Sequence, residues 1–270
     1  MKIVFLNTWG GKVFQPLMEF LRESASTTDF FCLQEVFDSP PHQRVGSGGS
    51  PEARLLSWGG RSNIGVELKH ALAGFQVSCY TPMADGCDGD EMMPISWGLT
   101  TFARKSITVD VCDAVPIAAP EVLHGNVPHP HFRMIQYIRF RRGERLFTLG
   151  NFHGTAYPGS KLDTPERISQ SQKIFNFLAG EQGEKILGGD FNLMPDTESI
   201  RMIEEMGMRN LIKEFNIGTT RSELNYARYP EERRQYFSDY VFTSSGIKIA
   251  SFQVPQLTIS DHLPMILEIA

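Results

Sequence analysis

The chain lacks any run of eighteen uninterrupted apolar residues, and this absence argues against a transmembrane helix. Its first stretch, MKIVFLNTWGG, reaches the polar Asn7 and then Gly10 too early for the apolar core of a secretory signal peptide. We therefore predict a soluble, cytoplasmic protein with no integral membrane association.

Cysteine is scarce, with Cys32, Cys79, Cys87 and Cys112 as its only occurrences, and no two of them form a CxxC pair. This spacing argues against the common zinc-binding and redox-active cysteine motifs. Three of the four lie in apolar, strand-like stretches. We therefore predict reduced thiols in the core or in loops, and no zinc ligands.

Positive charge is in the minority, because 26 Lys and Arg residues face 31 Asp and Glu residues, for a formal net charge of −5. A protein that holds long nucleic acid mainly by neutralising phosphates needs a basic face, so this balance disfavours non-specific duplex binding. A cluster of metal-binding carboxylates would account for part of the acidic excess, and bound divalent ions would reverse the local field.

Short apolar runs bounded by Gly, Pro, Asp or Ser recur along the chain and are rich in β-branched and aromatic residues, which predicts strands. The expected strands are residues 2–6, 30–34, 75–80, 98–103, 134–140, 145–152, 184–189, 239–242, 247–254 and 264–269. Helical patterns with capping residues predict helices between them, at residues 13–24, 62–73, 164–180 and 196–207.

This order of elements predicts an α/β fold in which two β-layers are covered by helices on the outside. No internal repeat or long linker divides the chain, so we expect one domain over residues 1–270. Three stretches have the composition of long loops, at 38–62, 113–131 and 216–236. Long loops in a compact domain are commonly functional, which makes these segments candidates for substrate selection.

Acids, amides and histidines recur where the predicted strands begin or end. The residues concerned are Asn7, Glu35, His153, Asp190, Asn192, Asp239, Asp261 and His262. Polar groups beside a core are costly without partners, so this repeated placement predicts that they satisfy one another or a shared ion.

The segment ILGGDFNLMPD, residues 186–196, illustrates two interpretations. In an extended chain Asp190 and Asn192 would project to the same side and face one spot, suited to a metal-bound water or a phosphate. Gly-Gly-Asp is also ordinary turn chemistry, in which an aspartate bonds its own backbone.

Carboxylate and amide oxygens without thiolates suit a hard cation such as Mg²⁺ or Mn²⁺, bound together with waters and a substrate phosphate. His153 and His262 would then contact phosphoryl oxygens, while Asp190 would hold an attacking water. These groups fit metal-assisted hydrolysis of a phosphate ester.

Six segments resemble those of the endonuclease/exonuclease/phosphatase superfamily, and they occur in the family's order along the whole chain: LNTWG, LQEV, GNFHG, GGDFN, SDYVF and SDHLP. The superfamily includes apurinic-site endonucleases, pancreatic-type deoxyribonucleases, tyrosyl-DNA phosphodiesterases, neutral sphingomyelinases and inositol polyphosphate phosphatases. The resemblance implies a four-layered α/β sandwich of two packed, mixed β-sheets flanked by helices, with the site at one edge.

The resemblance also implies how the metal and the attacking water are held. Glu35 would be the principal metal carboxylate, with Asn7 helping to bind metal or phosphate and Asp261 as a further acid of the metal site. Asp190 would orient or deprotonate the nucleophilic water, and Asn192 would contact phosphate or water.

Three further residues would complete the catalytic set. His262 would stabilise the phosphoryl transition state or act as a base, and Asp239 would fix its tautomer, as an aspartate does in a hydrolase triad. His153 would donate to a non-bridging phosphate oxygen. Lys161 and Arg167 follow this last segment, and we interpret them as solvated side chains.

The predicted activity is hydrolysis of a phosphodiester, with a phosphomonoester as the alternative, assisted by Mg²⁺ with Mn²⁺ as a substitute, through in-line attack of water. We expect a monomer that acts on a nucleic acid or a nucleotide. A phospholipid or an inositol phosphate remains an alternative substrate, because the fold alone settles neither. A non-catalytic binding protein on the same fold is an alternative of another class.

Overall fold

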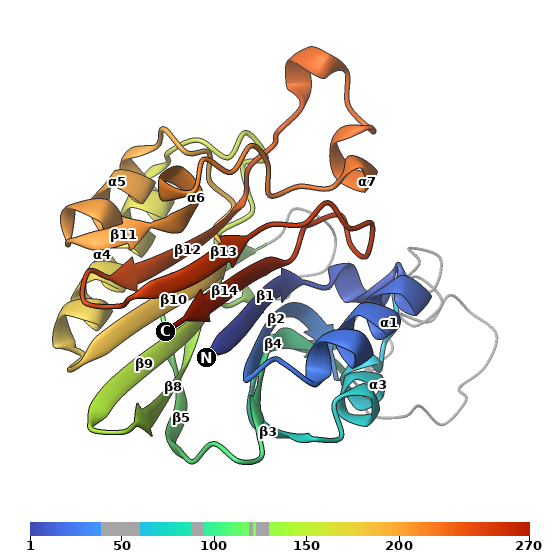
Figure 1. Cartoon of the computed structure of the whole chain (residues 1–270). Coiled ribbons are helices and arrows are strands. Elements are labelled where there is room, and N and C mark those ends of the chain that lie inside the picture. The colour runs from blue at the N-terminus through green and yellow to red at the C-terminus, as the bar shows by residue number, and fades with distance from the viewer. Residues whose placement is uncertain (39–59, 88–93, 119–120, 123–129) are drawn as a thin grey trace.

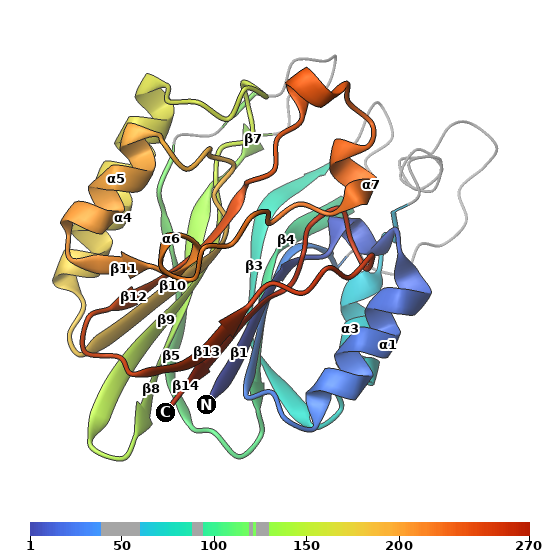
Figure 2. The same ribbon diagram turned by 45° about the horizontal axis from the view of Figure 1, so that its top comes forward.

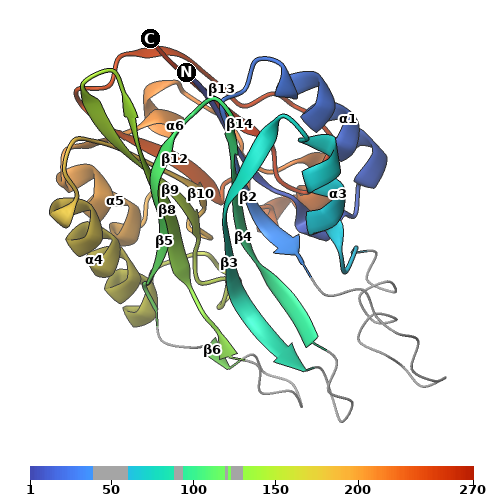
Figure 3. The same ribbon diagram turned by 90° about the horizontal axis from the view of Figure 1, so that it is seen from below.

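The structure is a computed structural model that describes residues 1–38, 60–87, 94–118, 121–122 and 130–270. Two mixed six-stranded sheets pack face to face (Figures 1 and 3). The first sheet has the order β13 (Ile249–Gln253), β14 (Met265–Ile269), β1 (Lys2–Asn7), β2 (Phe30–Phe37), β4 (Pro94–Arg104), β3 (Phe75–Cys87). The second has the order β11 (Met208–Asn210), β12 (Asp239–Ser244), β10 (Glu184–Asp190), β9 (Arg145–His153), β8 (Met134–Arg142), β5 (Val109–Pro116).

Helices cover both outer faces of this pair of sheets (Figure 2). Helices α1 (Phe14–Ala25) and α3 (Ile64–Ala71) lie against the first sheet, and α4 (Pro165–Gly180) and α5 (Glu198–Glu205) lie against the second. The predicted four-layered α/β sandwich is confirmed, as are all four predicted helices.

The sequence of strand β1 is apolar without alternation because both faces of the strand are buried. Ile3 and Phe5 belong to the core between the two sheets, whereas Val4 and Leu6 pack in a second core with α1 and α3. Successive residues of a strand point to opposite faces, so a strand buried on both faces must be apolar throughout. This pattern is the one expected for the central strands of a four-layered sandwich.

Smaller elements were not predicted from the sequence. They are β5, β11, the two-residue strands β6 (Glu121–Val122) and β7 (Pro130–His131), and the short helices α6 (Leu211–Glu214), α7 (Glu223–Tyr226), η1 (Trp9–Gly11) and η2 (Glu231–Arg233). Strand β5 forms an edge of its sheet and is largely exposed, so it carries no continuous apolar run.

These elements change the interpretation of two of the three predicted loops. Strand β5 extends into the stretch 113–131, and α7 and η2 lie within 216–236. Of the stretch 38–62, residues 39–59 lie outside the described part of the chain. Among the described residues, no helix is both long and apolar enough to cross a membrane.

The prediction of four reduced thiols is wrong for one pair, because Cys79 of β3 and Cys112 of β5 form a disulfide. Each strand is the edge of its own sheet, and the bond joins the two sheets along one side of the sandwich. The pairing depends on these two edges meeting in space, which spacing in the sequence does not reveal. Cys32 is a buried free thiol, as predicted.

A buried amide pair ties the two sheets together beneath one end of the sandwich. Gln34 of β2 donates from Nε2 to Oδ1 of Asn151 in β9 over 2.7 Å, and Asn151 donates in return to the Leu33 carbonyl over 3.1 Å. Gln136 of β8 extends this network by donating to Thr81 and accepting from Thr101. Hydrogen bonds fail at small displacements, so this network fixes how the sheets are placed relative to each other.

Gly188 and Gly189 are required by close packing at the end of β10. A side chain at Gly188 would start 2.7 Å from the Phe5 ring of the facing sheet. Gly189 has a φ of 138°, and a Cβ there would lie 2.0 Å from the Phe152 carbonyl oxygen of the neighbouring strand. Only glycine therefore allows β10 to deliver Asp190 at this depth.

Candidate active site

One end of the sandwich gathers polar residues from both sheets. Strands β1 and β2 run parallel, as do β9 and β10, so their final residues reach the same end. Strand β12 and the loop before β14 return antiparallel and begin there. All eight predicted site residues lie at this end: Asn7, Glu35, His153, Asp190, Asn192, Asp239, Asp261 and His262.

Asp190 lies at the centre of the arrangement. In the register of the second sheet it pairs with His153 on one side and with Asp239 on the other. Its Oδ2 lies 3.6 Å from Nε2 of His153 and 3.6 Å from Nε2 of His262. Nε2 of each predicted histidine therefore faces the same carboxylate oxygen of Asp190.

The other oxygen of Asp190 is held by its own segment. Oδ1 accepts from the backbone N–H of Asn192 over 2.9 Å and from the Ser238 hydroxyl. Asn192 is not extended but left-handed, with a φ of 54°, so it does not project beside Asp190. The turn interpretation of Gly-Gly-Asp is thus confirmed, and it leaves Oδ2 directed towards the histidines.

Asn7 connects the two sheets at the site. Its side-chain Nδ2 donates to Oε1 of Glu35 over 3.1 Å and to Oδ2 of Asp190 over 3.2 Å. Its Oδ1 accepts from the backbone N–H of Trp9 over 3.0 Å, which fixes the orientation of the amide. One amide group therefore joins the acid of the first sheet to the central acid of the second.

Glu35 owes its direction to an irregularity in β2. The pairing of β2 with β4 shifts register between Leu33 and Val36, and Glu35 itself has a φ of 55°. A bulge of this kind re-aims a side chain, and a left-handed non-glycine residue costs about 1–3 kcal/mol that the surrounding fold must offset. Burial, together with the nearby charge of Asp261, raises the pKa of the Glu35 carboxyl.

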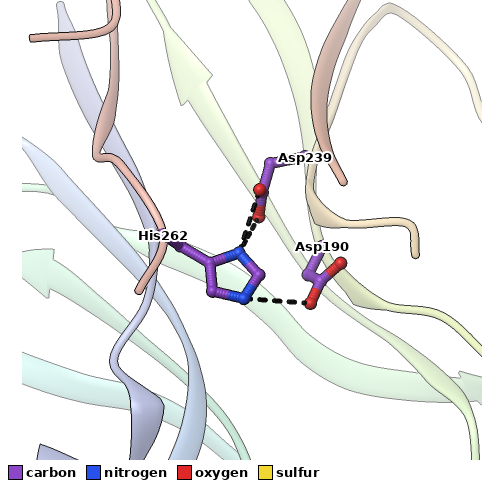
Figure 4. Close-up of side chains that lie close together, drawn as sticks. All are labelled: Asp190, Asp239 and His262. Atoms are coloured by element: carbon purple, nitrogen blue, oxygen red, sulfur yellow. Dashed lines mark hydrogen bonds and ion pairs between the residues drawn. The ribbon is translucent and has the colours of Figure 1, made fainter. Parts of the chain in front are cut away.

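His262 is paired with Asp239 (Figure 4). Nδ1 of the imidazole lies 2.9 Å from each carboxylate oxygen of Asp239, which directs Nε2 towards Asp190. Burial and the charge of Arg221 lower the pKa of His262, but Asp239, Asp261 and Asp190 outweigh them and raise it overall. This geometry is the predicted one, in which an aspartate fixes the tautomer of a histidine.

The pKa values of the two histidines are shifted in opposite directions. Burial lowers the pKa of His153 to about 3, and Asp190 opposes this effect only in part. His153 is therefore neutral near pH 7, and its Nδ1 has no hydrogen-bond partner in the described part of the protein. A neutral imidazole can donate one N–H to a phosphoryl oxygen without adding a charge to the site.

This neutral His153 predicts acid sensitivity of folding. The unfolded chain takes up a proton on His153 below about pH 6.5, whereas the folded chain resists it until about pH 3, so stability falls with falling pH in this window. Between pH 7 and 5 the wild type should lose about 2 kcal/mol more unfolding free energy than His153→Gln. Urea unfolding at both pH values measures this difference.

A matched control is His70→Gln, because His70 is exposed on α3. This variant should follow the wild type at both pH values. Equal acid losses for the wild type and His153→Gln would show that His153 does not resist protonation in the folded state.

Two basic residues that the sequence analysis placed in solvent are buried. Lys161 is 8% exposed, and its Nζ donates to Oδ1 of Asn192 over 3.0 Å and to the Ser238 hydroxyl over 2.8 Å. Burial lowers the pKa of Lys161 to about 8. Arg167 is fully buried, and its guanidinium donates to carbonyl groups of the segment between β9 and α4. Composition predicts neither burial, because both depend on how this segment folds back onto α4.

Arg221 and Asp261 form an ion pair that the sequence analysis missed. Arg221 is 6% exposed, and its Nη2 donates to Oδ2 of Asp261 over 3.0 Å. Its Nη1 lies against the imidazole of His262. Arg221 belongs to a stretch predicted to be a substrate loop, and no motif there distinguishes it from the other arginines.

Nearby charges keep Asp190 ionised. Burial alone would raise the pKa of its carboxyl, but His262, Lys161, His153 and Arg221 together hold it well below its usual range. Asp190 is thus an acceptor for hydrogen bonds at any pH near neutrality. This property suits it to orient a water molecule.

The donor set fits a divalent cation. Four carboxylates and two cationic side chains surround the site: Glu35, Asp190, Asp239, Asp261, Lys161 and Arg221. The four carboxylates outnumber these two cations, and a divalent cation such as Mg²⁺ or Mn²⁺ would offset the negative excess. Oδ1 of Asp261 is buried without a hydrogen-bond partner among the described residues, as expected of an oxygen reserved for a ligand.

A second grouping of ligand atoms lies beside this one. Asp190, Asp239 and His262 each offer an atom within 4.8 Å of the others. Because Asp239 and His262 already bond each other closely, we favour Glu35 and Asp261 as the ligands of a hard cation, with Asn7 holding Glu35 in place through Nδ2.

Comparisons with known proteins agree with this fold. The model of the Endonuclease/Exonuclease/phosphatase family matches residues 4–262. A family protein from Leptotrichia buccalis is 17% identical, with a TM-score of 0.68 over 100% of this chain and 99% of the other. A mannosyl-6-phosphatase from Bacteroides thetaiotaomicron is 15% identical, with a TM-score of 0.62 over 100% of this chain and 99% of that one.

A truncated Caenorhabditis elegans TDP2 is also 15% identical, with a TM-score of 0.58 over 99% of this chain and 96% of the other. A comparison with curated proteins found no match. At these identities the solved structures establish the fold. The family model covers all six resembling segments except the last two residues of SDHLP. The chain belongs to the endonuclease/exonuclease/phosphatase family.

Proposed function

We propose that this protein is a Mg²⁺-dependent phosphodiesterase that cleaves its substrate by in-line attack of water. The observation that carries the proposal is the convergence of Asn7, His153 and His262, from three separate segments, on one oxygen, Oδ2 of Asp190. A purely structural aspartate has no need for two histidines, and at 3.6 Å each imidazole faces this oxygen from just beyond hydrogen-bond distance.

Each residue then has a distinct task. Ionised Asp190 accepts a hydrogen bond from the attacking water and orients it. His262, supported by Asp239, places Nε2 beside the reacting phosphate and stabilises the charge that develops there. Neutral His153 donates to a non-bridging oxygen, and Lys161 holds the Asn192 side chain in place through Nζ.

A divalent ion, when bound, supplies neutralisation of the phosphate charge. Glu35 and Asp261 would hold it through hard carboxylate oxygens, and Asn7 would orient Glu35 and Asp190 beside it through Nδ2. Mn²⁺ should replace Mg²⁺, because both ions prefer oxygen ligands.

We favour a nucleic-acid or nucleotide substrate, with phospholipids and inositol phosphates as the alternative. Hydrolysis that falls steeply with added salt would support a nucleic acid. Activity that requires detergent or lipid vesicles would support the lipid alternative. A monomeric, cytoplasmic protein remains our prediction, although the disulfide between Cys79 and Cys112 is a feature more common in oxidising compartments.

The first test is hydrolysis of bis-p-nitrophenyl phosphate with and without Mg²⁺ or Mn²⁺, comparing the wild type with Glu35→Gln. The substitution keeps the shape of the side chain but removes its charge. We expect the apparent metal affinity to fall at least about a hundredfold, because losing even an outer partner of a metal ligand costs 10–100-fold. Calorimetric titration with Mg²⁺ measures the same affinity without turnover.

Glu19→Gln is the matched control, because Glu19 is exposed on α1. It should bind metal and hydrolyse as the wild type does. A Glu35→Gln variant with unchanged metal affinity and hydrolysis would exclude Glu35 as a metal ligand, whereas a wild type without hydrolysis would favour the non-catalytic alternative.

A further inference from the structure

Arg221 is built rigidly into the site. The backbone around it pairs with the loop that carries Asp261 and His262, through an isolated antiparallel bridge between Arg221 and His262. Ser222 donates its N–H to the Asp261 carbonyl over 3.1 Å, and Leu263 donates to the Thr220 carbonyl over 2.9 Å. The guanidinium therefore moves with the residues that it contacts, and not with the exposed part of its segment.

The two ends of the guanidinium have unequal partners. Nη2 donates to the charged Oδ2 of Asp261 over 3.0 Å, an oxygen that also accepts from Asn225 over 3.3 Å. Nη1 lies against an imidazole nitrogen of His262, which is a weaker acceptor than a carboxylate oxygen. Its Nε is buried without a hydrogen-bond partner in the described part of the chain. Asp261 thus holds Arg221 firmly at Nη2, whereas Nη1 has a weaker acceptor and Nε has none among the described residues.

The position of Nη1 is where a phosphoryl group would lie in the proposed reaction. It borders His262, whose Nε2 points to Oδ2 of Asp190. Lys161, a second buried cation whose charge acts on Asp190, is already bonded to Asn192 and Ser238. Of these two cations, Arg221 is the one that faces the reacting side.

We infer that Arg221 is a substrate-binding residue that donates from Nη1 to a non-bridging oxygen of the reacting phosphate while Nη2 stays on Asp261. This inference rests on the proposed function. For a guanidinium donor, an anionic oxygen is a stronger acceptor than an imidazole, because opposite charges on donor and acceptor add attraction to the hydrogen bond. The exchange frees Nε2 of His262 for the reacting group, and it adds a fixed positive charge to that of the metal.

The test is the affinity for inorganic phosphate, measured by calorimetry at saturating Mg²⁺ for the wild type, Arg221→Ala and Arg221→Lys. We expect Arg221→Ala to weaken phosphate binding at least about tenfold and turnover by about 10²-fold, with Mg²⁺ affinity within about threefold of the wild type. Free guanidinium should restore part of the turnover of Arg221→Ala. Arg221→Lys should also lose phosphate affinity, since one ammonium cannot serve both Asp261 and phosphate.

Arg233→Ala is the matched control, because Arg233 is an exposed arginine of η2 in the same stretch. Unchanged phosphate affinity with weakened Mg²⁺ binding would overturn the inference and leave Arg221 as a residue that only orients Asp261. If Arg221→Ala does not fold, Arg221→Lys decides in the same way. A wild type without metal-dependent turnover would overturn the proposed function, whereas the phosphate titrations would still decide the role of Arg221.

Discussion

Asp190→Asn should lower the turnover of bis-p-nitrophenyl phosphate by about 10⁴-fold at saturating Mg²⁺, as the loss of a central catalytic carboxylate does in hydrolases. The amide keeps the size of the side chain and one acceptor oxygen. It removes the negative charge that His262, Lys161, His153 and Arg221 stabilise at this point. The new amide also places N–H groups against Nδ2 of Asn7, so the hydrogen bond from Asn7 to residue 190 is lost.

The measurement is kcat over a range of Mg²⁺ concentrations, with thermal unfolding as a check that the variant is folded. Asp196→Asn provides the control, because Asp196 is an exposed acid of the segment that follows β10. A folded Asp190→Asn variant that keeps more than about a tenth of wild-type turnover would exclude Asp190 as the residue that orients the water.

His262→Ala should lower kcat by about 10³-fold, because general acid–base groups and donors to developing charge contribute 10²–10⁴-fold. Asp239→Asn should lower kcat less, by about 10²-fold, since the imidazole remains but can adopt the wrong tautomer. The two substitutions remove parts of one unit. The double variant should therefore be no slower than His262→Ala alone.

Rates of the two single variants and the double variant, measured at saturating Mg²⁺, give the coupling between the residues. The exposed His70→Ala should leave the rate unchanged. Additive losses in the double variant would mean that Asp239 acts independently of His262. Full activity of His262→Ala in saturating Mg²⁺ would contradict the proposed mechanism.

The sequence predicts the framework and the eight polar positions well, because each of them borders a strongly apolar run. Asp190 is the clearest case, since the glycines before it are dictated by the approach of Phe5 and the Phe152 carbonyl. The convergence of these positions follows from parallel neighbouring strands ending at one edge. The predicted roles themselves are inferred from the family resemblance and await the experiments above.

Features that depend on three-dimensional contacts could not be predicted. Lys161 and Arg221 are as polar as any surface residue, and only the folded chain shows that each is buried among partners. No residue of the segment LQEV indicates the bulge that orients the Glu35 side chain. The disulfide joins edge strands of different sheets, so neither the spacing of Cys79 and Cys112 nor their neighbours indicates the pairing.

The amide pair of Gln34 and Asn151 has a consequence for how this fold can diversify. It fixes the two sheets to each other directly beneath Glu35 and His153, so the spacing of these groups is set in the interior and not by the surrounding loops. Connections above the site can then lengthen, shorten or change sequence without disturbing that spacing. In evolutionary terms, a lineage with this scaffold can inherit its chemistry unchanged while new substrates are acquired through the loops alone.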